Sequence, residues 1–198
     1  MYKWNNNNNN YTPWNYKKIN KSATRYSAGV LPYTFDLNGK CLFLLGKDND
    51  NDWSDFGGRC EFKDRGEPVN TATREFYEET LGAVLNIQES IEKLTSASAI
   101  KIISKTLNGS PYYMYLMYID YFNYSDTFNK TTQFLRYQFD NQEMNKLIEK
   151  TTIRWVSMDT LLNCIENNQR DSPIPLRGVF YTTMINSKEQ FQFLIKSN

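Results

Sequence analysis

Histidine is absent from this chain of 198 residues. Its absence excludes a Ser-His-Asp triad, a Cys-His dyad, an HExxH zinc site and a histidine phosphoryl carrier. Any acid–base chemistry must therefore use carboxylates, lysine, tyrosine or water held by a metal ion, which are the other groups that transfer protons in enzymes.

Cysteine is scarce, and the three that occur, Cys41, Cys60 and Cys164, lie far apart. They form no CxxC pair, so the sequence does not indicate a zinc site. An odd number of cysteines favours free thiols in a reducing compartment, and small buried side chains are the ordinary reading of each.

Long apolar runs are also missing. No stretch approaches the roughly 20 apolar residues that a membrane-spanning helix needs. The amino-terminal MYKWNNNNNNYTPW lacks the apolar core of a signal peptide. A net charge of +1 gives no general attraction to nucleic acid or to an anionic membrane. We therefore expect a cytoplasmic protein without a membrane partner, and the sequence leaves its oligomeric state open.

Hydrophobic residues are plentiful: they make up 40% of the chain, and aromatic residues make up 15%, enough for one sizeable core. Residues 1–22 are Asn-rich and low in complexity, and we expect a flexible tail there. Residues 23–198 are expected to form a single domain.

Turn signals and hydrophobic periodicity divide this domain into strands and helices. Asn38-Gly39 and Asn108-Gly109 each separate two apolar runs and predict two β-hairpins. The sequence WSDFGG, 53–58, predicts a short strand that ends in a glycine turn. Further elements are expected as a helix from Pro68 to about Gly82, helices over 126–149, 159–168 and 187–196, and a strand over 151–158. Because the strands and helices do not alternate regularly, the fold class is mixed α/β (α+β).

The most informative segment is TATREFYEETLGAV, 71–84, which carries Glu75, Glu78 and Glu79 beside Arg74. On a helix these glutamates are spaced i, i+3 and i+4, so their carboxylates lie on one side and repel one another. They are either a solvated face with an arginine partner or a set of hard oxygen ligands for Mg²⁺ or Mn²⁺. Gly57 and Gly58 upstream favour the second reading, because glycine permits close approach of the main chain to a metal ion or a phosphate.

The segment resembles the Nudix hydrolase family, whose motif is G-x5-E-x7-R-E-U-x-E-E-x-G-U, with U for an apolar residue. REFYEE, 74–79, matches the core of this motif without a gap, and Gly58 matches its first glycine. Trp53 before the double glycine and IRWVSMDTLL near the last strand agree with the family as well. The resemblance covers about residues 27–165 and implies an α/β/α sandwich with a mixed β-sheet.

The spacing of the motif departs from the family pattern. If Glu67 is the isolated glutamate, eight residues separate it from Gly58 instead of five, and six separate it from Arg74 instead of seven. Counting five residues from Gly58 without a gap gives Asp64 as the alternative. Gly82 also comes one residue late. Lys63 and Arg65, in the lengthened loop, are either solvated charges or contacts to substrate phosphates.

The resemblance implies a Mg²⁺- or Mn²⁺-dependent pyrophosphohydrolase in which water attacks a phosphorus of a diphosphate. Glu78, Glu79 and the carbonyl oxygen of Gly58 are the implied metal ligands, and Glu75 is a further ligand or the general base. Arg74 is implied to hold a glutamate in place. On this basis Glu79→Gln is expected to abolish activity and to leave folding intact.

Other positions extend this site. The family often adds an acid from a distant loop, and Glu149 is the first choice here, with Glu143 second. Glu67 is a further acidic candidate. Arg25, just before the first strand, is a candidate for phosphate binding beside Arg65.

The resemblance does not identify the substrate. A small nucleoside diphosphate derivative is favoured, since the neutral chain lacks a long basic stretch for RNA. Two alternatives stay open: a hydrolase of the mRNA 5′ cap, and a Nudix-fold nucleotide-binding or regulatory module without catalysis. A plain interaction domain is a third reading, and it predicts that metal ions leave the stability of the protein unchanged.

Overall fold

A computed structural model describes residues 25–97, 99–139, 147–166 and 174–191. The predicted tail, 1–22, and Glu143 lie outside these ranges. Within them no helix is both long and apolar enough to cross a membrane. Seven strands occur in the described residues: β1 (Ser27–Phe35), β2 (Cys41–Asp48), β3 (Trp53–Ser54), β4 (Phe56–Arg59), β5 (Ile100–Lys105), β6 (Pro111–Tyr118) and β7 (Lys150–Ser157).

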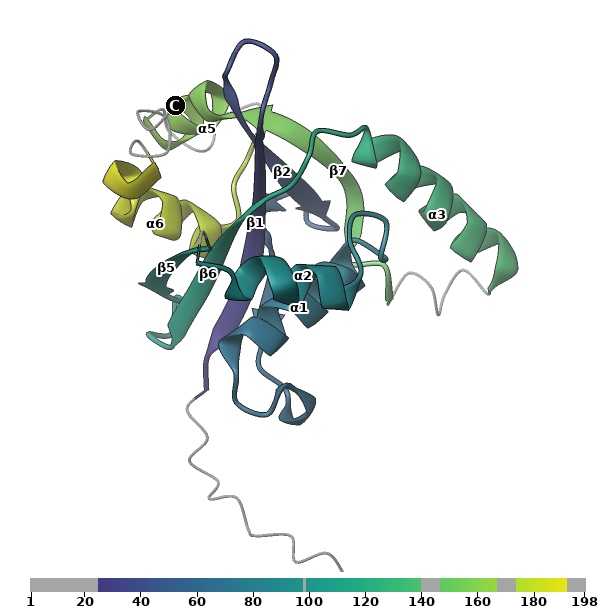
Figure 1. The fold of residues 1–198 in the computed structure, drawn as a ribbon, viewed down its shortest axis with the longest axis horizontal. Coiled ribbons are helices and arrows are strands. Elements are labelled where there is room, and N and C mark those ends of the chain that lie inside the picture. The colour runs from purple at the N-terminus through teal and green to yellow at the C-terminus, as the bar shows by residue number, and fades with distance from the viewer. Residues whose placement is uncertain (1–24, 98, 140–146, 167–173, 192–198) are drawn as a thin grey trace, which may run out of the picture.

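The seven strands form one mixed sheet (Figure 1). Its main path runs β3-β2-β1-β6-β5, and β4 pairs with β1 while β7 pairs with β2. The β1–β6 pair is parallel and all the other pairs are antiparallel. Both predicted hairpins are confirmed, because β1 pairs with β2 and β5 with β6, and Gly39 and Gly109 have the positive φ that such turns need.

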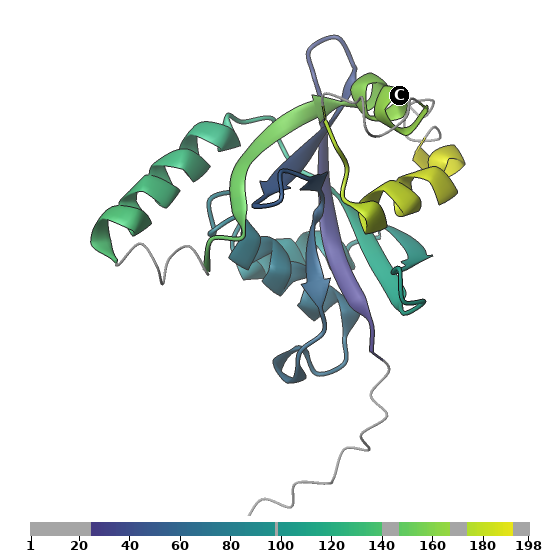
Figure 2. The ribbon, with the colours of Figure 1, turned by 180° about the vertical axis from the view of Figure 1, so that it is seen from behind.

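Helices cover both faces of the sheet (Figures 1 and 2). They are α1 (Pro68–Glu79), α2 (Ile87–Thr95), α3 (Tyr124–Gln138), α5 (Met158–Glu166) and α6 (Gly178–Asn186), with a 3₁₀ turn, η1 (Phe62–Asp64), before α1. One core lies between the sheet and α1, α2 and α3, and the other lies between the sheet and α5 and α6. Alternate strand residues such as Val30 and Leu31 enter opposite cores. The expected α/β/α sandwich with a mixed sheet is confirmed.

Several predicted elements need correction. The glycine turn at Gly57-Gly58 is wrong, because both glycines are strand residues of β4 paired with β1. The helix expected over 126–149 is observed as α3, which ends at Gln138, and Ile148 and Glu149 are not helical. The helix expected over 187–196 is seen only at 188–191 within the described residues, directly after α6. Neither α2 nor α6 was predicted.

Candidate functional site

Helix α1 is fixed against the sheet by its apolar side. Phe76 and Ala72 are fully buried, and the ring of Phe76 meets the ring of Phe56 edge to face, with 5.4 Å between centroids. Pro68 starts the helix, where its missing N–H costs nothing. This packing turns the side of α1 that carries Arg74 and Glu75 toward the end of β4.

Arg74 is the centre of the acidic cluster. Its Nη1 donates to Glu75 Oε1 at 2.8 Å and to Glu78 Oε2 at 2.9 Å, and its Nη2 donates to the carbonyl oxygen of Arg59 at 2.9 Å. Only 9% of the Arg74 side chain is exposed, so these charge-assisted bonds are shielded from solvent. The guanidinium therefore holds two of the three predicted glutamates within reach of one point.

Asp64 holds the other edge of this guanidinium. Its Oδ1 accepts from Arg74 Nε at 2.9 Å, and its Oδ2 accepts from Arg74 Nη2 at 3.0 Å, which is a bidentate pair. Oδ2 also accepts from the main-chain N–H of Glu61 and from the hydroxyl of Thr71. Burial opposes the ionisation of Asp64, but these hydrogen bonds outweigh it and keep its pKa below the ordinary value.

The structure thus brings Asp64, and not Glu67, to the cluster. Glu67 is exposed and occupies the N-cap position of α1, without a side-chain cap bond. The signal for Asp64 was the count of five residues from Gly58, and the two extra residues lie in the turn between η1 and α1, where Arg65 and Gly66 have positive φ.

Gly58 lies directly against Glu75. A Cβ atom at Gly58 would be 2.5 Å from Cδ and Oε1 of Glu75, so only a glycine leaves room for this carboxylate. Burial is the main reason that the pKa of Glu75 is raised, and nearby Glu78 and Glu149 raise it further while Arg74 lowers it. The main chain of β4 and the predicted base are therefore neighbours.

Glu79 faces away from Arg74, into the sheet. Its Oε2 accepts from the main-chain N–H of Gly57 at 2.8 Å, and its Oε1 lies 3.2 Å from Nζ of Lys150. Lys150 is 1% exposed and also donates to the hydroxyl of Ser54 at 3.0 Å. Burial raises the pKa of Glu79 to about 8, although Lys150 acts in the opposite direction.

The sequence gave no signal for Lys150, because a lysine next to the exposed Glu149 at the start of a strand looks like a surface residue. Gly46 on the neighbouring strand makes its burial feasible. A Cβ atom at Gly46 would be 2.9 Å from Cδ of Lys150 and 2.9 Å from Cε1 of Phe56. The lysine stem thus fills the space that a side chain at residue 46 would take.

The remaining predicted residues are only partly brought together. Glu149 is exposed but close enough to raise the pKa values of Glu75 and Glu79 electrostatically. Lys63 pairs with Glu78 at 3.1 Å. Arg25 lines a cavity beside Gly58, whereas Arg65 does not line it.

The donor set fits a divalent cation in part. Glu75 and Glu78 converge on a single Arg74 nitrogen, and carboxylate oxygens are the ligands that Mg²⁺ and Mn²⁺ prefer. Glu79 fits less well, since Gly57 and Lys150 already occupy its two oxygens. Accordingly, in the described part of the chain no three His, Cys, Asp or Glu side chains are yet arranged as a metal site.

A cavity of about 860 Å³ opens on the other side of β4. Gly57 and Gly58 form part of its wall, so it adjoins the acidic cluster through the main chain of β4. Buried Asp55 and Tyr112 line it, together with the first turn of α6. The sequence analysis named none of these residues except Gly57, Gly58 and Arg25.

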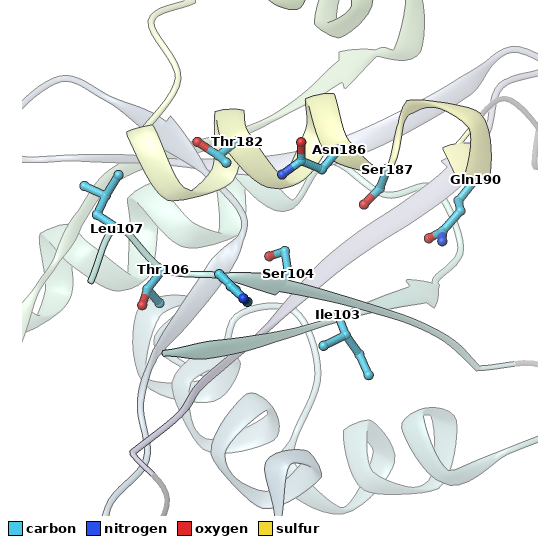
Figure 3. A pocket seen from close by; sticks show the side chains of 9 residues that line it. Ile103, Ser104, Thr106, Leu107, Thr182, Asn186, Ser187 and Gln190 are labelled. Atoms are coloured by element: carbon cyan, nitrogen blue, oxygen red, sulfur yellow. The ribbon is translucent and has the colours of Figure 1, made fainter. Parts of the chain in front are cut away.

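A smaller cavity, of about 420 Å³, lies between β5 and α6 (Figure 3). Polar uncharged side chains such as Ser104, Thr182 and Asn186 line it, and Lys105 is its one ionisable lining residue. It contains no carboxylate and no residue of the acidic cluster, so it contributes nothing to that site.

No family model matches the sequence, and no curated protein matches it either. Similar solved structures include the Nudix hydrolase RenU from M. smegmatis, with 14% identity and a TM-score of 0.48 over 84% of this chain and 86% of that chain. An Ap4A hydrolase from C. elegans shares 14% identity, with a TM-score of 0.46 over 84% and 98%. Shewanella oneidensis NrtR, also solved with a 27mer DNA, shares 13% identity, with a TM-score of 0.46 over 85% and 64%.

Nudix hydrolases are thus among the similar structures, as the motif indicated. At such identities and TM-scores the likeness assigns no activity, and the chemistry has to be argued from the residues of this chain.

Proposed function

We propose that this protein is a Nudix-type pyrophosphohydrolase that cleaves the diphosphate of a nucleoside diphosphate derivative. The observation that carries the proposal is the placement of Glu75 and Glu78 on one guanidinium nitrogen of Arg74, with Gly58 giving the Glu75 carboxylate access to the main chain of β4. A solvated acidic face would not require a 9%-exposed arginine to order it.

Glu75, Glu78 and the carbonyl oxygen of Gly58 are the groups that would hold Mg²⁺ or Mn²⁺, with Glu149 as the further acid. A divalent cation bound there would neutralise the diphosphate, acidify the attacking water and stabilise the leaving oxygen. The notebook of ligands implied by the motif also contains Glu79, which would first have to exchange Lys150 for the cation.

The chain's own residues do the positioning. Arg74 fixes the carboxylates, and Asp64 fixes Arg74, so the acidic cluster is preorganised before a substrate arrives. Glu75 is the proposed base: it accepts the proton of the attacking water at a carboxylate oxygen, and its half-buried setting suits that task.

A second candidate is a nucleotide-binding module without catalysis. The pairing of Glu79 with Lys150 favours it, because this contact removes an acid that the motif implies as a metal ligand. The two candidates make opposite predictions about turnover.

To test the proposal, purified protein is incubated with Mg²⁺ or Mn²⁺ and dinucleoside polyphosphates, nucleotide sugars, dinucleotide cofactors or capped RNA, in ¹⁸O-labelled water. We expect hydrolysis of a small nucleotide, with ¹⁸O in one phosphate product, and its loss in Glu78→Gln. Glu92→Gln, which changes an exposed acid of α2, is the matched control and should retain activity. Binding of nucleotides without turnover of any of them would favour the module, and preferred cleavage of capped RNA would identify the cap as the substrate.

A further inference from the structure

The cavity beside β4 has a buried acid in its wall. Asp55 is 5% exposed, and the hydroxyl of Tyr112 donates to its Oδ2. In the described part of the chain, no hydrogen bond is made to its Oδ1. A buried carboxylate oxygen that lines a cavity and lacks a donor is a ready acceptor for an N–H or O–H group of a ligand.

Two glycines hold Asp55 and Tyr112 in this arrangement. The hydroxyl of Tyr112 lies where a Cβ atom of Gly29 or Gly57 would stand, at 2.7 Å from the Gly57 position. The tyrosine can therefore cross the sheet surface to reach Asp55. Nothing in the acidic cluster on α1 requires this pair, so it calls for another explanation.

Cationic groups line the same cavity. Arg25 and Arg59 lie at its end near Gly58, because the start of β1 pairs with the end of β4. Arg177 lies close enough to Asp55 to lower its pKa. The first turn of α6 follows Arg177, and its free main-chain N–H groups also favour a negative charge.

The cavity matches a ligand with a neutral polar half and an anionic half. Asp55 and Arg59 are four residues apart along an extended segment, which is about 13 Å at the rise of a β-strand. A nucleoside 5′-diphosphate has comparable reach, and a volume of about 860 Å³ holds a molecule of that size. Leu107 and Phe180 supply apolar surface for the base.

We propose that this cavity binds a nucleoside 5′-diphosphate unit: Asp55 accepts a hydrogen bond from the nucleoside, and Arg25 and Arg59 bind the diphosphate. The inference rests on the proposed function and assigns its specificity to residues outside the motif. Tyr112 is a positioning residue, since it acts through Asp55.

The test is calorimetric titration of ADP, adenosine and inorganic pyrophosphate into the protein in EDTA, so that binding is measured without turnover. We expect Asp55→Asn to weaken ADP and adenosine about tenfold and to leave pyrophosphate unchanged. Arg59→Gln should weaken ADP and pyrophosphate about tenfold and leave adenosine unchanged. Arg136→Gln, on the exposed surface of α3, is the control and should change none of the three.

Tyr112→Phe guards against misfolding of the Asp55 variant, because it keeps the ring and removes only the hydroxyl; it should weaken adenosine as well. Equal ADP affinity in all variants, or no ADP binding to the unmodified protein, overturns the proposal. Failure of the proposed function looks different: ADP would bind with this pattern of losses while no substrate is hydrolysed. Conversely, hydrolysis with an unchanged KM in Asp55→Asn and Arg59→Gln would leave the hydrolase standing and overturn the assignment of the cavity.

Discussion

Gly57 and Gly58 are neighbours in β4, yet a methyl group added to each meets a different obstacle. At Gly58 it meets the carboxylate of Glu75, which is the end of a flexible side chain and can move. We predict that Gly58→Ala lowers hydrolysis about 100-fold by displacing Glu75, since small displacements of a catalytic group cost that much. The free energy of unfolding, measured with urea, should change by less than about 1 kcal/mol.

Gly57→Ala is the matched comparison. A Cβ atom there would be 2.6 Å from Cα of Gly29 and 2.8 Å from the carbonyl oxygen of Ala28, which are main-chain atoms that cannot move aside. This variant should lose about 1–3 kcal/mol of stability. If Gly58→Ala were the less stable of the two, its effect would be structural and Glu75 would lose its assigned role.

The pairing of Lys150 with Glu79 reverses an expectation drawn from the sequence. Glu79→Gln was expected to leave folding intact by relieving repulsion between glutamates. In the structure it would instead leave the buried Lys150 ammonium without its acid. We predict a loss of about 3–5 kcal/mol, as for other broken buried ion pairs.

Urea unfolding of a double-mutant cycle measures this contact. Lys150→Met combined with Glu79→Gln should cost less than the sum of the two single changes. Glu166→Gln breaks the exposed Lys188–Glu166 pair and serves as the surface control, with an expected loss below about 1 kcal/mol. Additive losses in the buried pair would show that the two charges do not depend on each other.

At the scale of elements, α2 depends on its first residue. The side chain of Asn86 accepts from the main-chain N–H of Glu89 at 2.9 Å, and the Glu89 side chain accepts from the N–H of Asn86 in return. Asn86→Ala should lower the free energy of unfolding by about 1 kcal/mol, while Asn86→Asp, which still caps the helix, should leave it nearly unchanged. Equal losses in both variants, again measured with urea, would assign the effect to packing instead of capping.

Local chemistry explains which elements could be predicted. The hairpins follow from Asn-Gly turns, and α1 follows from Pro68 and its apolar stripe, so the sequence nearby was sufficient. The glycines of β4 were misread as a turn because their reason is distant: Gly29 and Tyr112 occupy the space that side chains would fill. Helix α2 was missed although Asn86 and Glu89 form a capping box that the sequence displays.

At the scale of the whole molecule, two buried acids connect stability to pH. Burial raises the pKa of Asp55 to about 6 and that of Glu79 to about 8, above their ordinary values of 3.8 and 4.5. Because the folded protein keeps these protons to a higher pH than the unfolded chain does, stability should fall as pH rises through this window.

Asp55→Asn should remove the part of this decline between about pH 4 and 6, about 3 kcal/mol at 1.36 kcal/mol per pKa unit. The part between pH 6 and 8 should remain, since Glu79 is unchanged. Urea unfolding at pH 4.5, 6 and 8 measures both parts, and Asp120→Asn, at an exposed position, should reproduce the unmodified profile. A profile of Asp55→Asn that equals the unmodified one would mean that Asp55 is ionised without cost.

The candidate site shows the same division between near and distant causes. Arg74, Glu75, Glu78 and Gly58 could be found because the motif is contiguous or nearly so. Asp64 required a choice between two counts that only the observed bidentate pair resolves. Lys150, Asp55 and Arg177 come from separate strands and a helix start, so nothing short of the fold brings them to the site.

The absence of a side chain at Gly46 reaches beyond this one molecule. Any ancestor that acquired lysine at position 150 needed a vacancy at position 46 first, since the stem passes through that space. Among descendants, an alanine or larger residue at 46 should therefore be accompanied by a shorter residue at 150, so that the two positions are inherited as a pair.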